Sequence, residues 1–197
     1  MNRTRTRTTK GPDELRAGLL AAAADLFAVR GFSEVSITDI TSEAGVATGT
    51  FYRYFPSKDE VLTQLRHHVL QELLERVAAV LAAGQPDDWW AAAESMIDAT
   101  VRFWFEDRAR SLVVLRGDFT DEAARAESVL ADTFAAGMRL GQQVGAVDET
   151  IDVDVAASLL LHGATGLVYH AIVDNHALPD ALVAAISALA RRMLAPR

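Results

Sequence analysis

Cysteine is absent from this sequence, which excludes disulfides, thiolate metal sites and cysteine nucleophiles. No apolar run approaches the roughly 20 residues of a membrane-spanning helix, and the basic, threonine-rich start of the chain lacks the apolar core of a signal peptide. We therefore expect a cytoplasmic location. The sequence also lacks a glycine-rich phosphate loop, a Gly-x-Ser-x-Gly segment and paired metal ligands, so it argues against an enzyme and indicates no cofactor.

The distribution of charge matters more than its total. The formal net charge is −8 at pH 7, which by itself is unusual for a protein that binds nucleic acid. Residues 1–68 contain nine Lys and Arg against eight Asp and Glu, a net charge of +1, whereas residues 69–197 contain ten against nineteen, a net charge of −9. Residues 1–11 form a basic tail that we expect to be disordered, and it either reaches a DNA groove or stays solvated. A basic first part suits DNA phosphates.

The hydrophobic spacing is helical throughout the chain and predicts an all-α fold of about nine helices. Pro12 opens the first helix and Gly31 ends it. Two short helices follow, and then a long helix from Ser57 to about Ala83. Five more helices are expected at about 87–106, 108–115, 121–143, 152–174 and 179–194. The long helix starts beside the two short helices and ends well inside the second part, so we expect it to link the two parts mechanically.

The stretch from Ser36 to Lys58 contains the two short helices. Ser36 is a good N-cap, and the carboxylate of Asp39 lies three positions later, where it favours the first helical turn. Gly45 supplies the turn between the helices, and we expect a positive φ there. Pro56 ends the second helix after about two turns, because a residue that precedes proline is disfavoured in the α region.

The second short helix has a buried side and an outward side. Val46, Phe51 and Phe55 fall on the buried side. The outward flanks carry small hydroxyls and tyrosines, namely Thr48, Thr50, Tyr52 and Tyr54. This pattern suits a DNA-reading helix-turn-helix, although periodicity alone equally allows an ordinary helical corner.

From Arg16 to Leu65 the sequence resembles the N-terminal domain of the tetracycline-repressor (TetR) family of transcriptional regulators. The matching stretches are LLAAAADLFAVRGF at 19–32, SITDIT at 36–41, AGVATGTFYRYF at 44–55 and SKDEVL at 57–62. The resemblance implies a three-helix DNA-binding domain over 12–65 and a helical ligand-binding and dimerisation domain over 66–197. It also implies a homodimeric repressor that a small apolar or amphipathic ligand releases from a palindromic DNA operator.

The resemblance also implies which residues meet DNA. Phosphate contacts fall on Ser36, Thr50, Tyr54 and Lys58, and base contacts on Thr38, Thr48 and Tyr52, with Gly49 beside them in the recognition helix. Lys58 is a cation at the start of a helix, where it opposes the dipole, and this suggests a phosphate partner. The alternative is a solvated lysine without a partner. The sequence departs from the family pattern at Ala47 and Thr48, where a serine cap and a basic residue are frequent.

Aromatic side chains gather in the second part of the chain, at Trp89, Trp90, Phe103, Trp104, Phe105 and Phe119, with Phe134 and Tyr169 further on. Such spacing is typical of plain helical core. The resemblance implies a cavity for an inducer, and our candidates to line it are Phe103, Trp104, Phe134, Met138, His162 and Tyr169. His162, His170 and His176 invite comparison with a metal site, but isolated histidines on helices are more often polar core or surface residues.

The last two long helices carry small residues, including Gly163 and Gly166 in the first of them and several alanines in the second. Small faces let helices approach closely, either within one subunit or between two. In the family these helices form the dimer interface, so the resemblance implies a homodimer through them. A different class of function also remains open: a helical adaptor that binds a protein partner and uses its helix-turn-helix only for packing.

Overall fold

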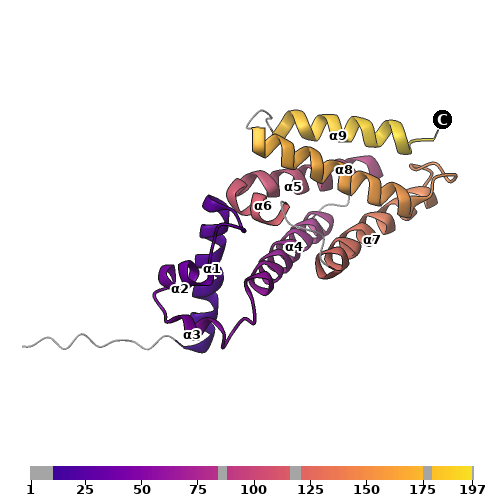
Figure 1. Cartoon of the computed structure of the whole chain (residues 1–197). Helices are drawn as coiled ribbons and strands as arrows, with labels where there is room; N and C mark the ends of the chain where they lie inside the picture. The colour runs from indigo at the N-terminus through magenta and orange to yellow at the C-terminus, as the bar shows by residue number, and fades with distance from the viewer. Residues whose placement is uncertain (1–10, 84–87, 116–120, 175–178, 197) are drawn as a thin grey trace, which may run out of the picture. The chain divides into compact units, whose positions relative to one another are not determined.

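The computed structural model describes residues 11–83, 88–115, 121–174 and 179–196. Over these residues the chain forms nine helices and no strands (Figure 1). The predicted all-α fold is therefore confirmed. The basic tail over residues 1–10, Phe119 and His176 lie outside the described residues.

The chain divides into two compact units, Met1–Leu65 and Arg66–Arg197. Helix α4 begins in the first unit and continues into the second. The helices are α1 (Pro12–Arg30), α2 (Ile37–Glu43), α3 (Thr48–Phe51), α4 (Lys58–Ala83), α5 (Trp89–Glu106), α6 (Arg108–Leu115), α7 (Asp121–Gln143), α8 (Val153–Asp174) and α9 (Pro179–Leu194). These bounds agree with the expected ones to within about two residues, except at α3.

The ends of α1 follow from its terminal residues. Pro12 occupies the first helical position, and the Glu14 carboxylate accepts a hydrogen bond of 3.1 Å from the Gly11 N–H. Gly31 ends the helix at φ +81°, with its N–H donating to the Phe27 carbonyl at 2.9 Å. The inner side of α1 meets the inner sides of α2 and α3 in a core of large, almost inaccessible side chains: Leu19, Phe27, Val35, Ile40, Phe51 and Phe55.

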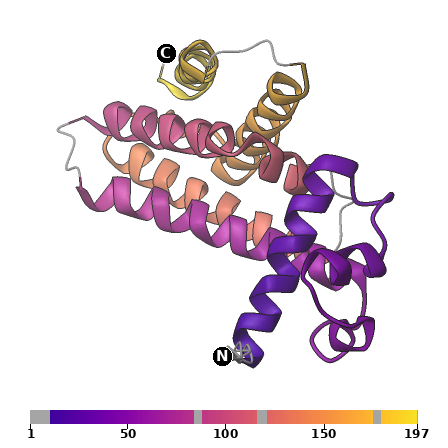
Figure 2. The same ribbon diagram turned by 90° about the vertical axis from the view of Figure 1, so that its left-hand side faces the viewer.

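In the second unit α7 packs against α8, and α5 packs against α9, which Figure 2 shows end-on above α5. Buried side chains of this unit form two clusters. One joins α4, α5, α7, α8 and α9 and includes Leu73, Val77, Trp104 and Val168. The other joins α5, α7, α8 and the end of α9 and includes Trp90, Met138, Val153 and Leu194. The half-buried Phe134 packs against both clusters.

Candidate functional site

The start of α2 is closed by a reciprocal pair of hydrogen bonds. The Ser36 hydroxyl oxygen accepts from the Asp39 N–H at 3.1 Å, and the Asp39 carboxylate accepts from the Ser36 N–H at 2.8 Å and from its hydroxyl at 2.6 Å. These bonds favour the charged carboxylate and lower the pKa of Asp39 to about 2, with Arg30 at 3.4 Å adding a smaller effect. The hydroxyl of Ser36 is thus already engaged within the protein.

The turn between α2 and α3 has the geometry that the sequence predicts. Gly45 has φ +69°, and the next residue, Val46, donates its N–H to the Thr41 carbonyl at 2.9 Å. Thr41 is buried, and its hydroxyl donates to the Thr38 carbonyl at 3.1 Å and lies 3.4 Å from the Thr48 hydroxyl. The two helices are therefore held together through a buried threonine as well as through apolar packing.

Helix α3 is shorter than the sequence predicts. It spans Thr48–Phe51, a single turn, where about two turns were expected. Its N-cap, Ala47, has no side-chain oxygen to accept a hydrogen bond from the helix. At the other end the N–H groups of Tyr54 and Phe55 both donate to the Phe51 carbonyl, at 2.9 and 3.0 Å, which closes a turn before Pro56. Tyr52 and Tyr54 therefore follow the helix, which corrects our placement of Tyr52 within it.

In the α3 segment, residues 48–55, buried and exposed side chains alternate sharply. Phe51 and Phe55 are fully buried, whereas Tyr52 between them is 59% exposed. Thr50 and Tyr54 are half-buried. The predicted DNA contacts Thr38, Thr48, Gly49 and Tyr52 all lie on exposed positions, and Arg53 joins them. Our sequence reasoning missed Arg53, although a cation directly after Tyr52 in the segment FYRYF was a usable signal.

Lys58 has hydrogen-bond partners within the protein. The sequence suggested instead either a DNA phosphate as its partner or a solvated side chain. Its ammonium donates to the carbonyls of Phe32 and Val35, at 2.6 and 2.7 Å, and lies 4.2 Å from the centre of the Phe32 ring. These carbonyls offset the unfavourable position of a cation at the start of α4. Because an ammonium has three donors, one remains for a phosphate. Lys58 therefore joins the start of α4 to the loop between α1 and α2, and it is not a solvated lysine.

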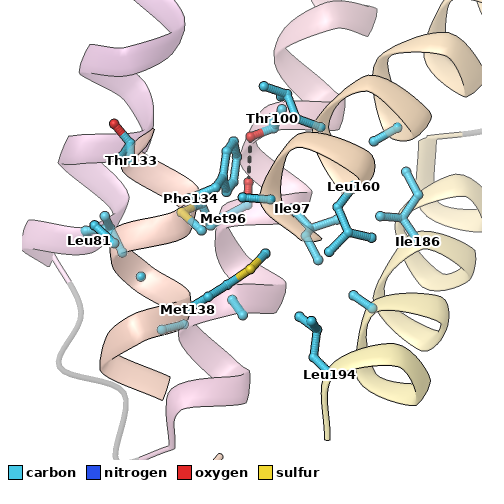
Figure 3. A pocket seen from close by; sticks show the side chains of 18 of the residues that line it. Leu81, Met96, Ile97, Thr100, Thr133, Phe134, Met138, Leu160, Ile186 and Leu194 are labelled. Carbon is cyan, nitrogen blue, oxygen red and sulfur yellow. Dashed lines mark hydrogen bonds between the residues drawn. The ribbon is translucent and has the colours of Figure 1, made fainter. Parts of the chain in front are cut away.

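The second unit contains a cavity of about 700 Å³, lined by residues of α4, α5, α7, α8 and α9. Its wall takes Trp104, Leu161 and Ile186 from one core cluster and Trp90, Met138 and Leu194 from the other, so the cavity lies between the clusters. Figure 3 shows Phe134 and Met138 in the middle of it, with Leu81 toward one side and Ile186 and Leu194 toward the other. The volume is in the range of small-molecule sites.

Three of the six side chains predicted to line a cavity do so here: Trp104, Phe134 and Met138. Phe103, His162 and Tyr169 do not line it, which corrects those assignments. Phe103 precedes Trp104 on α5, so it points about 100° away around the helix. Its ring centre lies 5.4 Å from Cζ of the Arg76 guanidinium. His162 is exposed on α8, with its Nδ1 atom 2.7 Å from the Ser158 carbonyl oxygen, and the half-buried Tyr169 stacks edge-on against His170.

The sequence analysis placed Trp89 and Trp90 in the aromatic group but not in the cavity. Both line it, so all three tryptophans of the chain do. The Trp89 ring lies against Gly141 of α7, and its Nε1–H donates to the Gly137 carbonyl at 2.9 Å. Two glycines four residues apart thus leave room on α7 for the indole ring. The glycine spacing could have predicted this contact only if the packing of α5 against α7 had been known. Among the described residues, no group of three potential metal ligands comes together.

Helices α8 and α9 carry a large apolar surface on the outside of the analysed chain. On α8 the exposed side chains include Val155, Leu159 and Leu167, at 63%, 61% and 47%, with the exposed Gly163 and Gly166 between them. On α9 Leu189 is 57% exposed. By length and hydropathy alone, α8 is also long and apolar enough to cross a membrane, as the core helices of many proteins are. Exposed apolar surface of this extent marks a contact with another molecule.

Comparison with known proteins agrees with this geometry. Residues 19–65 match the model of "Bacterial regulatory proteins, tetR family". The chain is 32% identical over 97 residues to the HTH-type transcriptional regulator YvdT of Bacillus subtilis, covering 49% of this chain and 48% of that protein. It is 26% identical over 160 residues to the regulator YdgC of the same organism, covering 80% and 78%.

Among solved structures, the chain is similar to the regulator FadR of Bacillus subtilis in complex with stearoyl-CoA. The TM-score is 0.77 at 20% identity, and the match covers 88% of this chain and 96% of that one. At this identity the match shows the fold alone.

The capped α2, the glycine turn and the α3 segment with its exposed tyrosine define a helix-turn-helix regulatory protein. The matched N-terminal model and the relatives, all of them regulators, place it more narrowly. Residues 19–65 match the TetR family of bacterial regulatory proteins, and over 160 residues the chain is similar to a helix-turn-helix transcriptional regulator.

Proposed function

We propose that this protein is a homodimeric transcriptional repressor whose first unit reads an operator and whose second unit holds a ligand that weakens operator binding. The observation that carries the proposal is the exposure of Tyr52 between two fully buried phenylalanines. The Tyr52 ring touches the Phe51 ring edge-on, at 5.5 Å between centres, but most of the side chain remains exposed. In a helix-turn-helix, an exposed amphipathic aromatic side chain at this position suits contact with DNA.

In this proposal the residues that contact DNA divide into two groups. Thr38, Thr48 and Tyr52 read base edges and thymine methyls in the major groove. Thr50, Tyr54 and Arg53 bind phosphates, and the remaining donor of Lys58 makes one further phosphate contact. Ser36 could reach a phosphate only by giving up its bond to Asp39, so we drop it from the expected contacts.

The exposed apolar face of α8 and α9 supports dimerisation through these two helices. Two such faces, one from each subunit, make a four-helix interface in which the exposed Gly163 and Gly166 allow close approach. A membrane would cover the same face, but a cytoplasmic dimer agrees better with operator binding. An inverted-repeat operator follows from the symmetry, with half-site centres about 34–36 Å apart or a multiple of that distance.

The cavity and α4 supply a route from ligand to DNA. Leu81 near the end of α4 lines the cavity, whereas Lys58 at its start belongs to the DNA-reading unit. Two ion pairs, Glu72 with Arg110 and Arg76 with Glu106, join α4 to α6 and α5. A ligand that favours a different position of α4 must weaken DNA binding by the factor by which DNA weakens ligand binding, typically a coupling of ~1–3 kcal/mol. FadR, of the same fold, holds a long acyl chain, which supports an apolar ligand here.

The experiment is selection of bound sequences from random DNA, followed by footprinting on the DNA that flanks the gene, with the full chain and with Tyr52→Ala. We expect an inverted repeat, and we expect the Tyr52→Ala variant to lose tenfold or more in affinity and to discriminate less at one or two base pairs. The control is Asp25→Ala, an exposed change on α1 in the same unit. No selected sequence, or equal binding by both variants and the parent, would favour the adaptor function.

A further inference from the structure

We propose that the ligand of the cavity is a lipophilic cation, whose apolar body fills the cavity and whose positive group lies at Asp132. The proposal rests on the ligand-binding role proposed above and adds the charge of the ligand. Three independent observations lead to it: the hydrogen-bonding state of the lining, the position of Asp132, and the charge of the second unit.

Several side-chain donors of the lining are already engaged within the protein. The Thr100 hydroxyl donates to the Met96 carbonyl, as the dashed line in Figure 3 marks, and the Thr133 hydroxyl donates to the Val129 carbonyl, both at 2.8 Å. The Trp89 N–H donates to the Gly137 carbonyl. Thr165 supplies the only other hydroxyl among the described lining residues. A ligand carboxylate or phosphate needs several donors, and three of the six side-chain donors among the described lining residues are already used; the others are the Thr165 hydroxyl and the N–H groups of Trp90 and Trp104.

Asp132 is the only ionisable side chain among the described residues that line the cavity. It is exposed, and so are Val129, Ala136 and Leu140, which line the cavity from the same face of α7 at helical spacing. Leu81 of α4 is 46% exposed and also lines it. The cavity therefore opens between this face of α7 and the end of α4, and Asp132 stands at the opening among apolar side chains.

No described residue forms an ion pair with Asp132, so its charge is available to a ligand. A carboxylate at this opening attracts a cation and repels an anion. The surrounding charge acts in the same direction, because residues 69–197 carry a net charge of −9. Stearoyl-CoA, the ligand of the FadR complex, is polyanionic, whereas no Lys, Arg or His is among the described lining residues. We therefore infer that the two proteins share a fold but differ in the charge of their ligands.

The test uses three probes with one tail, namely dodecyltrimethylammonium, dodecanol and dodecanoate, each below its micellar concentration at pH 7.5. Because all three tryptophans line the cavity, their emission reports binding to the full chain directly. We expect dodecyltrimethylammonium to bind at least tenfold more tightly than dodecanoate, with dodecanol between them. In the Asp132→Asn variant, the affinity for dodecyltrimethylammonium should fall to within about threefold of the affinity for dodecanol, and the affinity for dodecanol should not change.

Glu75→Gln is the matched control, since Glu75 is an exposed carboxylate on α4 outside the cavity, and it should preserve the order of the probes. Dodecanoate binding as tightly as the cation would overturn the proposal, as would an Asp132→Asn variant with the parent's preference. If none of the three probes changes the tryptophan emission, the ligand-binding role itself is overturned, and the two failures are thereby distinguished. Far-UV circular dichroism confirms that each variant is folded.

Discussion

The two units of this protein are stabilised in different ways. In the first unit, hydrogen bonds hold the connections between helices: Ser36 and Asp39 bond to each other at the start of α2, and the Lys58 ammonium donates to two carbonyls. These bonds surround a core that includes the fully buried rings of Phe51 and Phe55. In the second unit, apolar helices enclose a cavity of about 700 Å³ between two core clusters. A rigid reading surface and a core with space inside it suit opposite tasks, since one must hold a shape and the other must accept a ligand.

The largest effect that we expect separates the inner and outer sides of the α3 segment. Phe51→Ala removes a fully buried ring and should lower the free energy of unfolding by ~3–5 kcal/mol. Tyr52→Ala, at the neighbouring exposed position, should change it by less than about 0.5 kcal/mol. Urea denaturation followed by circular dichroism measures both. Equal destabilisation by the two variants would mean that Tyr52 is part of the core.

A second change tests the bonds of Lys58. Lys58→Met keeps most of the aliphatic stem but removes the ammonium from the Phe32 and Val35 carbonyls, and we expect a loss of roughly 1–3 kcal/mol in unfolding free energy. A solvated lysine, the alternative that the sequence left open, would give almost no change, so this result distinguishes the two accounts. His67→Ala, at an exposed site on α4, is the control. A Lys58→Met protein as stable as the parent would mean that the Lys58 ammonium is solvated and that its bonds to the two carbonyls do not stabilise the fold.

A pair of glycines on α7 tests the packing around the cavity. A Cβ at Gly141 would lie 2.6 Å from Val147 Cγ2 and 2.7 Å from Trp89 Cε2, so Gly141→Ala should destabilise the protein by ~1–3 kcal/mol and alter the tryptophan emission. A Cβ at Gly137 meets nothing within 4 Å, so Gly137→Ala should stabilise the helix by roughly 0.5–1 kcal/mol. Thermal melting measures both. Opposite signs are expected, and a stabilising Gly141→Ala would show that Trp89 can move away freely.

The smallest effect concerns the cap of α2. Ser36→Ala should cost about 1 kcal/mol in unfolding free energy. The pKa of Asp39 is lowered from 3.8 to about 2, so its stabilising contribution is present above pH 4 and is lost as the pH falls toward 2. Ser36→Ala removes the first cause of that shift, so the variant should depend less on pH in this window. An unchanged pH profile would mean that Ser36 does not set the pKa of Asp39.

Features that depend on neighbouring residues in the sequence could be predicted, and features that depend on distant ones could not. The Ser36 cap, the positive φ of Gly45 and most helix bounds follow from local residues, and the structure agrees with them. The partners of Lys58 lie 23 and 26 residues away, in a loop whose path the sequence does not indicate.

The wall of the cavity shows the same limit. Trp104 and Phe103 are adjacent and equally apolar, yet only Trp104 faces the space, because the rotation of α5 is set by how it packs on α9 and α4. Likewise, whether His162 or Leu161 faces inward depends on the packing of α8 against α7. A helical period gives the relative directions of side chains but not which direction is inward when several faces are apolar.

The most direct test of the account measures the coupling between the two units. Dodecyltrimethylammonium is titrated into the full chain with and without saturating selected DNA, with tryptophan emission as the readout. The DNA is then titrated with and without the compound, by fluorescence anisotropy. The account predicts that each partner weakens the other by the same factor, between about 5 and 150, as linkage requires. Tight binding of both partners with no change in either affinity would contradict the claim that the second unit regulates the first.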